Sequence, residues 1–268
     1  MLTIGLVGCG TIGSRLALEI ESKFRGVARL IGLYDHHPKA AQLLIHRLRR
    51  KVPVLPPKKL ISRSDLLIEA ASAQAVGELL PHVIAMKKSA LLMSTGGLLN
   101  HRRLLSRAVA LHIPIYLPSG ALVGLDGIKG AACAPVHSVT LTTRKHPTAF
   151  VGAPEVTRRK IQLHRIWKPR LLFQGSALQA VRAFPQNINV AATVALAGIG
   201  PTRTRVRVIA DPTLRANVHE VETVGDFGRM ITRTENRPSQ ENPKTSTLAV
   251  LSAIATLRQI LQPLRIGT

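Results

Sequence analysis

Acidic and aromatic residues are both scarce in this sequence. Among 268 residues, 14 are Asp or Glu against 37 Lys or Arg, which gives a formal net charge of +23. Aromatic residues make up 3 %, so the core has to be built from Ala, Val, Ile and Leu, a composition typical of parallel sheets covered by helices. Because 46 % of residues are hydrophobic, disorder is excluded and we expect a folded, two-domain α/β protein.

Cysteines and long apolar runs are also few. Cys9 and Cys133 are the only cysteines, and their spacing excludes a disulfide framework and predicts no metal site. No apolar run approaches the roughly 20 residues that span a bilayer. The apolar run at residues 2–7 resembles a core strand more than a signal peptide. We therefore expect a cytoplasmic protein with no membrane association.

The excess of positive charge raises the question of nucleic-acid binding. The basic residues are spread from Arg15 to Arg265, and no aromatic residues are interleaved with them for base stacking. A specific nucleic-acid partner is therefore not expected. The positive field would instead attract anionic cofactors and small dicarboxylate substrates.

Residues 1–117 alternate between short apolar runs and stretches with helical spacing. Strands are predicted at 2–7, 28–34, 65–71, 90–93 and 113–117, and helices at 14–22, 38–50, 73–88 and 98–112. Strands alternating with helices in this way are typical of a doubly wound parallel sheet. We expect an N-terminal Rossmann domain that binds NAD or NADP.

A different pattern begins after Pro118. The segment SGALVGLDGIKGA is glycine-rich and predicts a loop, and half-buried strands are predicted at 138–143, 203–209, 218–224 and 227–233. Residues 118–245 therefore form a smaller mixed α/β (α+β) domain, to which we assign substrate binding, catalysis and dimerisation. Residues 246–268 carry a closing helix that is expected to pack back on the first domain.

A glycine motif lies between the first strand and the first helix. It comprises Gly8, Gly10 and Gly13, with Thr11 and Ile12 between the last two glycines. Glycines in this context allow a tight turn and the close approach of a pyrophosphate to a helix N-terminus. These five residues are therefore predicted to bind the dinucleotide. The alternative is a simple tight turn.

Asp35 ends the second predicted strand, where a carboxylate can accept hydrogen bonds from the adenosine ribose. It favours NAD, although His36, His37 and Lys39 could tolerate the 2′-phosphate of NADP. Asp35 could instead be a helix cap before Pro38. Residues 94–97 follow another strand end and form either a ligand loop or a simple turn.

Several longer motifs resemble the L-aspartate dehydrogenase family. The matching strings run in order from Gly5 to Leu257: GLVGCGTIG, STGGLLN, LPSGALVGLDGIKGA, TTRK, FPQNINVAATVALAG, DP with NVHEVE, FG and ENPKTSTLAVLSAIATL. The resemblance implies NAD(P)-dependent oxidation of L-aspartate through iminoaspartate to oxaloacetate and ammonia, or the reverse amination. It also implies a homodimer, and a supply of iminoaspartate for NAD biosynthesis.

Site residues follow from the same motifs. By the resemblance, His219 in NVHEVE matches the catalytic histidine, Ala121 a residue whose backbone amide meets the cofactor, and Asn189 an asparagine near the nicotinamide. Asn187 is the alternative to Asn189. A histidine suits this chemistry, because the substrate amine must lose a proton and the imine must be hydrolysed. Basic residues within motifs could bind the substrate carboxylates: Arg144, Lys145 and Lys244.

Other functions remain open from the sequence alone. Another two-domain reductase, similar to dihydrodipicolinate reductase or homoserine dehydrogenase, would explain the first domain but not NVHEVE together with FPQNINVAA. A non-catalytic NAD-binding sensor would bind the cofactor without turnover. The high basicity and the histidine pair after Asp35 depart from the family pattern, and they leave the choice between NAD and NADP undecided.

Overall fold

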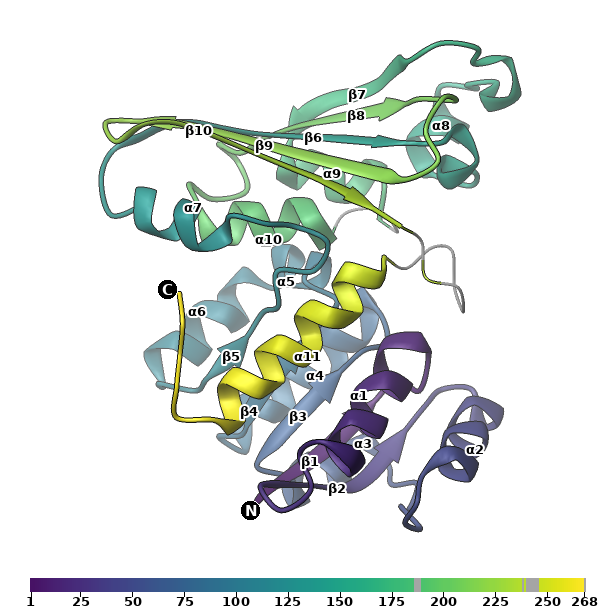
Figure 1. Ribbon diagram of the computed structural model, residues 1–268, viewed down its shortest axis with the longest axis vertical. Coiled ribbons are helices and arrows are strands. Elements are labelled where there is room, and N and C mark those ends of the chain that lie inside the picture. The colour runs from purple at the N-terminus through teal and green to yellow at the C-terminus, as the bar shows by residue number, and fades with distance from the viewer. Residues whose placement is uncertain (186–188, 238, 240–245, 268) are drawn as a thin grey trace. The chain divides into compact units, whose positions relative to one another are not determined.

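The computed structural model describes residues 1–185, 189–237, 239 and 246–267. The chain divides into two compact units, each shown in Figure 1. The first unit is Met1–Pro118 with Val250–Arg265, and the second is Ser119–Ala249 with Ile266–Thr268. In the described part of the chain, no helix has the length and apolarity that crossing a membrane requires.

The first unit contains a five-stranded parallel sheet with the order β2-β1-β3-β4-β5. Its strands are β1 (Leu2–Val7), β2 (Ala28–Tyr34), β3 (Leu66–Glu69), β4 (Ser89–Leu92) and β5 (Ile115–Tyr116). The strand order reverses at β1, since β2 lies on one side of it and β3 on the other. Ligands bind such sheets at the carboxyl ends of the strands beside this reversal. The prediction of a Rossmann domain is confirmed.

Helices connect these strands, and a last helix joins them from the end of the chain. They are α1 (Thr11–Ser22), α2 (Pro38–Arg47), α3 (Pro57–Arg63), α4 (Ala73–Ala85), α5 (Gly96–Asn100), α6 (Arg102–Ala110) and α11 (Thr247–Leu261). The predicted single helix over 98–112 was wrong, because α5 and α6 are separated at His101, whose backbone is not helical (φ −120°, ψ 35°). The His101 ring packs so closely on α4 that a Cβ on Gly77 would lie 2.5 Å from its Nε2. Helix α3 was not predicted.

The C-terminal helix α11 belongs to the core of the first unit. Its residues Val250, Ala253, Ile254 and Leu257 join the buried cluster that also contains residues of β1, β2 and α1. In Figure 1 the helix lies on the same side of this sheet as α1. The predicted return of the C-terminal helix to the Rossmann domain is confirmed.

The second unit contains a mixed five-stranded sheet with the order β10-β9-β6-β8-β7. Its strands are β6 (Val136–Lys145), β7 (Arg170–Ser176), β8 (Arg205–Ala210), β9 (Asn217–Gly225) and β10 (Gly228–Asn236). Helices α7 (Leu125–Ala131), α9 (Ala177–Ala183) and α10 (Asn189–Ala197) cover one face of the sheet in Figure 1. Shorter helices lie between β6 and β7: η1 (Pro147–Phe150), α8 (Pro154–Arg158) and η2 (Leu163–Arg165). The predicted mixed α/β fold is confirmed.

Two details of the second unit differ from the prediction. The glycine-rich segment 119–131 is not all loop, since it contains α7. Its glycines permit close packing: a Cβ on Gly127 would lie 2.7 Å from Sδ of Met230 on β10. Strand β7 was missed because it lies at the sheet edge and does not alternate cleanly between buried and exposed residues.

Candidate active site

The glycine motif forms the turn from β1 to α1. Gly8 has φ +94°, and a Cβ there would lie 2.4 Å from the carbonyl oxygen of Ala70. A Cβ on Gly13 would lie 1.9 Å from the carbonyl oxygen of Gly8, whereas a Cβ on Gly10 would have no atom within 4 Å. Gly8 and Gly13 are therefore needed for packing, while Gly10 leaves space beside the loop.

The start of α1 is suited to an anion. Gly10 is the N-cap of this helix and no side chain caps it, with Thr11 as the first helical residue, followed by Ile12. Helix N-termini with backbone N–H groups and a positive dipole end bind phosphate. The open side of Gly10 and this helix start fit the pyrophosphate of a dinucleotide.

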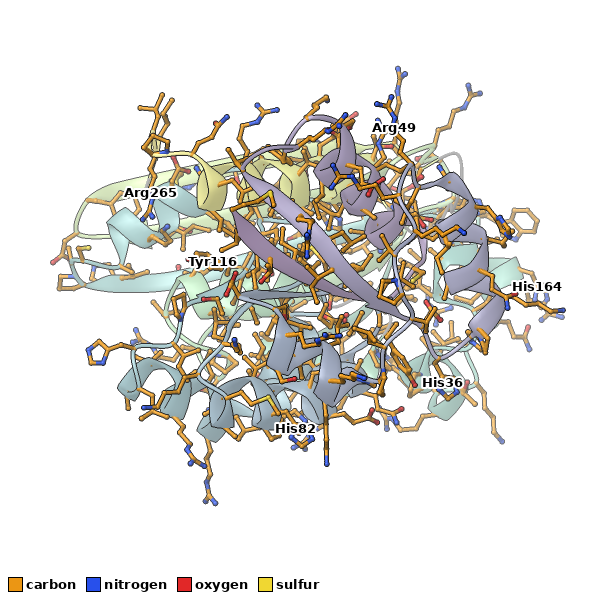
Figure 2. All side chains as sticks on the ribbon, turned by 90° about the horizontal axis from the view of Figure 1, so that it is seen from below. His36, Arg49, His82, Tyr116, His164 and Arg265 are labelled. Atoms are coloured by element: carbon orange, nitrogen blue, oxygen red, sulfur yellow. The ribbon has the colours of Figure 1, made fainter. Side chains whose placement is uncertain are left out.

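Asp35 is fixed beside the same turn. Its Oδ2 accepts a hydrogen bond from the backbone N–H of Cys9 at 2.7 Å, and its Oδ1 accepts one from the N–H of His37 at 2.8 Å. These bonds hold a half-buried carboxylate next to the phosphate loop, where a ribose would lie. The exposed side chain of His36, the next residue, is labelled in Figure 2.

Cys9 has no features of a nucleophile. Its Sγ lies 3.7 Å from the carbonyl oxygen of Tyr34. Burial, with a further contribution from the Asp35 charge, raises the pKa of the thiol to about 12. The thiolate is the reactive form of cysteine, so at neutral pH this residue acts as a small packing group in the loop.

His219 occupies a central position in the sheet of the second unit. It lies on β9, opposite Thr143 of β6 on one side and Thr234 of β10 on the other. Its Nδ1 is 3.1 Å from Oγ1 of Thr143, and the residue is 3 % exposed. Burial first, and then the positive charge of Lys145, lower the pKa of the imidazole to about 3. The ring is therefore neutral at physiological pH.

Lys145 lies near the imidazole of His219, whereas Arg144 lies on the opposite face of the sheet. Successive residues of a strand face opposite sides of the sheet, so Thr143 and Lys145 share one face of β6 while Arg144 lies on the other. Burial lowers the pKa of Lys145 to about 8. Of the two basic residues in TTRK, Lys145 is therefore the one that the fold brings to the side of His219.

Ala121 is also tied to the strand beside His219. Its carbonyl oxygen accepts hydrogen bonds from Nδ2 of Asn236 at 3.0 Å and from Oγ1 of Thr234 at 3.1 Å. Asn236 is 3 % exposed and its Oδ1 accepts a hydrogen bond from Ser246 at 3.1 Å. The loop that carries Ala121 is thereby held on β10, the strand that pairs with β9.

The remaining predicted site residues are less informative. Asn189 begins α10, is exposed, and accepts a hydrogen bond from Oγ1 of Thr193 through its backbone carbonyl oxygen at 2.9 Å. Asn187 and Lys244 lie outside the described residues.

The prediction missed Thr143, Thr234 and Asn236, which surround the histidine strand. Strand alternation places Thr143 with Lys145, and Thr234 with Asn236, on one face of each strand, but their position beside His219 depends on the register between strands.

Glu69 is a further residue that the sequence analysis missed. It ends β3 at the carboxyl edge of the first sheet and is fully buried. Its Oε1 accepts hydrogen bonds from the N–H of Ala71 at 2.7 Å and from Oγ of Ser94 at 2.8 Å, and its Oε2 accepts one from the N–H of Ser94 at 3.0 Å. Its position at the end of an apolar strand, in a chain with few acids, was the available signal.

Comparisons with known proteins match both halves of the chain. Residues 126–260 match the family described as "Aspartate dehydrogenase, C-terminal", and residues 8–118 match "Homoserine dehydrogenase, NAD binding domain". Among solved structures, aspartate dehydrogenase from Thermotoga maritima superposes with a TM-score of 0.73 at 24 % identity, and the match covers 100 % of both chains. A homoserine dehydrogenase from Thiobacillus denitrificans has a TM-score of 0.62 at 12 % identity, covering 97 % of this chain and 73 % of its own. At these identities the superpositions show the fold alone.

Curated relatives match over the full length of the chain. L-aspartate dehydrogenase from Methanosarcina barkeri is 47 % identical over 274 residues, and the match covers 100 % of both chains. The corresponding protein from Nitrosopumilus maritimus is 40 % identical with the same coverage, and one from Bradyrhizobium diazoefficiens is 36 % identical over 100 % of this chain and 94 % of its own. Since a family-specific C-terminal half follows an NAD-binding half along one continuous match, the chain belongs to the L-aspartate dehydrogenase family.

Proposed function

We propose that this protein catalyses the NAD(P)-dependent oxidation of L-aspartate through iminoaspartate to oxaloacetate and ammonia, or the reverse amination. The observation that carries the proposal is the buried, neutral His219 held by Thr143 near Lys145, in a chain whose first unit carries a dinucleotide loop. Release of iminoaspartate for NAD biosynthesis is part of this proposal. A homoserine-dehydrogenase-like reductase would account for residues 8–118 but not for residues 126–260.

In the proposed mechanism His219 and Lys145 act on the substrate. A bound nicotinamide supplies the hydride acceptor for the substrate Cα. Because Nδ1 of His219 is engaged by Thr143, we assign proton exchange to Nε2, which would take the proton that the substrate nitrogen loses. After this proton has passed to solvent, the same imidazole would take a proton from the water that attacks the imine carbon and return it to the nitrogen that leaves as ammonia. Lys145 would bind a substrate carboxylate, and we leave Arg144 out of the site.

The proposed cofactor site consists of Gly8, Gly10 and Gly13 with the start of α1, and of Asp35. Gly10 and the start of α1 would hold the pyrophosphate, and Asp35 would hold the adenosine ribose. A carboxylate there attracts ribose hydroxyls and repels a 2′-phosphate, which favours NAD over NADP. Ala121 and Asn189 complete the proposed cofactor contacts, as the family resemblance implies.

We further propose that the protein works in the cytoplasm as a homodimer. The supporting observation is the exposure of large apolar residues between β6 and β7, where Trp167 is 82 % and Val151 is 71 % exposed. Exposed large apolar side chains, Trp above all, are enriched in protein interfaces.

The expected result of sedimentation equilibrium is a mass of two chains, with Trp167→Ala shifting the equilibrium towards monomer. The matched control is Leu43→Ala, because Leu43 is an apolar residue of the first unit that is 68 % exposed. A monomer at micromolar concentration would contradict the homodimer.

Replacing His219 tests the catalytic assignment. His219→Ala should lower kcat for the amination of oxaloacetate with ammonium and NADH by about 10²- to 10⁴-fold, the usual contribution of an acid–base group. NADH binding should be retained. The measurement is absorbance at 340 nm, with NADPH assayed in parallel and expected to be the poorer cofactor. The control is His137→Ala, since His137 is an exposed histidine of the same unit paired with Asp226. Equal turnover in His219→Ala would remove this residue from the mechanism.

The charge of Lys145 should control the binding of dicarboxylates. Since its pKa is about 8, the ammonium is present below that pH and is lost above it. The inhibition constant of succinate, a non-reacting dicarboxylate, should therefore be flat near pH 7 and rise by about tenfold per unit above pH 8. Lys145→Met should weaken succinate at pH 7 and abolish this dependence, whereas Arg144→Met should preserve both. An unchanged profile in Lys145→Met would refute the assignment.

A substitution at Gly10 tests cofactor binding without disturbing the fold. Because a Cβ at Gly10 meets no protein atom within 4 Å, Gly10→Ala should fold normally. The methyl group would occupy the place of the pyrophosphate, so NADH affinity should fall by at least about tenfold, as expected when a backbone approach is blocked. Fluorescence titration with NADH measures this. The control is Gly130→Ala, whose Cβ also meets nothing within 4 Å. Undiminished affinity in Gly10→Ala would place the pyrophosphate elsewhere.

A further inference from the structure

Glu69 is a buried acid that the proposed mechanism does not use. It is 0 % exposed and lies between Val7 of β1 and Leu92 of β4 in the sheet register. Burial raises the pKa of its carboxyl group, and the hydrogen bonds that it accepts oppose this shift. A buried carboxyl group at the ligand edge of a Rossmann sheet is costly for stability, which points to a function.

The carboxylate joins two loops at this edge. One loop follows β3 and is held through the N–H of Ala71 at 2.7 Å. The other follows β4 and is held through the N–H and hydroxyl of Ser94 at 3.0 and 2.8 Å. All three groups are donors, so they require both carboxylate oxygens as acceptors.

The loop after β3 also forms one wall of the dinucleotide turn. A Cβ on Gly8 would lie 2.4 Å from the carbonyl oxygen of Ala70 and 2.8 Å from the nitrogen of Ala71. The nitrogen of Ala71 is the same atom that Glu69 holds. In Figure 1 strands β1, β3 and β4 lie side by side, so the ends of all three reach this edge. A shift of Ala71 would therefore move the backbone against which Gly8 is packed.

We propose that Glu69 is a positioning residue for the cofactor, which sets the shape of the dinucleotide turn through Ala71 and couples it to the Ser94 loop. It does not touch the dinucleotide itself. The inference rests on the proposed place of the dinucleotide at the glycine turn. In this inference Glu69 affects cofactor binding indirectly, through the loops that follow β3 and β4.

Glu69→Gln is the sharpest test, because the side chain keeps its shape but loses one acceptor. In either orientation of the amide, its NH₂ group faces the backbone N–H of Ala71 or of Ser94. One backbone hydrogen bond is thereby lost, and the others weaken because the remaining acceptor is no longer charged. The Kd for NADH, measured by fluorescence titration without substrate, should rise by about tenfold, the scale of one lost buried hydrogen bond to a charged group. Hydrogen exchange should accelerate at Ala71 or Ser94.

Asp65→Asn provides a matched control at the opposite end of the same strand. Asp65 precedes β3, and its Oδ2 accepts hydrogen bonds from the N–H and hydroxyl of Thr3 at 2.9 and 2.6 Å. This acid-to-amide change also weakens a tie between strands, but at the edge away from the glycine turn. It should lower the melting temperature and leave the Kd for NADH unchanged. A purely structural role for Glu69 would give the same result in Glu69→Gln.

Ser94→Ala keeps the inference testable if Glu69→Gln does not fold. It removes one hydroxyl donor to Glu69 and keeps the backbone, so the Kd for NADH should rise by about threefold. Normal NADH affinity in a folded Glu69→Gln, or in Ser94→Ala when Glu69→Gln is unfolded, overturns the inference. If Gly10→Ala loses NADH while Glu69→Gln binds it normally, the proposed function stands and only the role of Glu69 fails. Absence of NADH binding in the wild-type protein would overturn both.

Discussion

The close approach of two backbone segments at the first turn is the constraint on which the dinucleotide site depends. A Cβ on Gly13 would lie 1.9 Å from the carbonyl oxygen of Gly8, so α1 can start directly behind β1 only if residue 13 is glycine. This places the helix N-terminus at the strand reversal, where its N–H groups can meet an anion. Asp35 and Glu69 then fix the turn from two sides, through Cys9 and Ala71.

The second unit is distinguished by two buried basic side chains. It buries a histidine and a lysine on adjacent strands, and each has a pKa lowered by burial. Desolvation disfavours both charged forms, so the pair provides a neutral base near a cation that is weakened but still charged at neutral pH. The negative charge of an entering dicarboxylate would raise the pKa of both groups, which would make the imidazole a stronger proton acceptor. The high positive charge of the whole chain would add long-range attraction for such a substrate.

The local sequence pattern predicted the helices and strands that show a clear hydrophobic periodicity. It failed where tertiary contacts determine the backbone conformation. The strands of the first sheet were found because buried parallel strands appear as continuous apolar runs. The predicted helix over 98–112 was wrong because the backbone of His101 is not helical. The ring of His101 packs against Gly77 of α4, a contact that no short-range pattern reveals. The glycines of α7 indicated a loop, although they serve its close packing against Met230.

The sequence by itself determined the fold class and the glycine turn with Asp35, because each depends on residue types at fixed spacing along the chain. The histidine motif was found through its resemblance to the L-aspartate dehydrogenase family. Only the tertiary structure decided that Lys145 rather than Arg144 lies on the face of His219, and that Thr143 holds the ring. It also revealed the carboxylate of Glu69 beneath the dinucleotide turn. Such contacts join residues far apart in the chain. They depend on strand order and register, which local spacing does not encode.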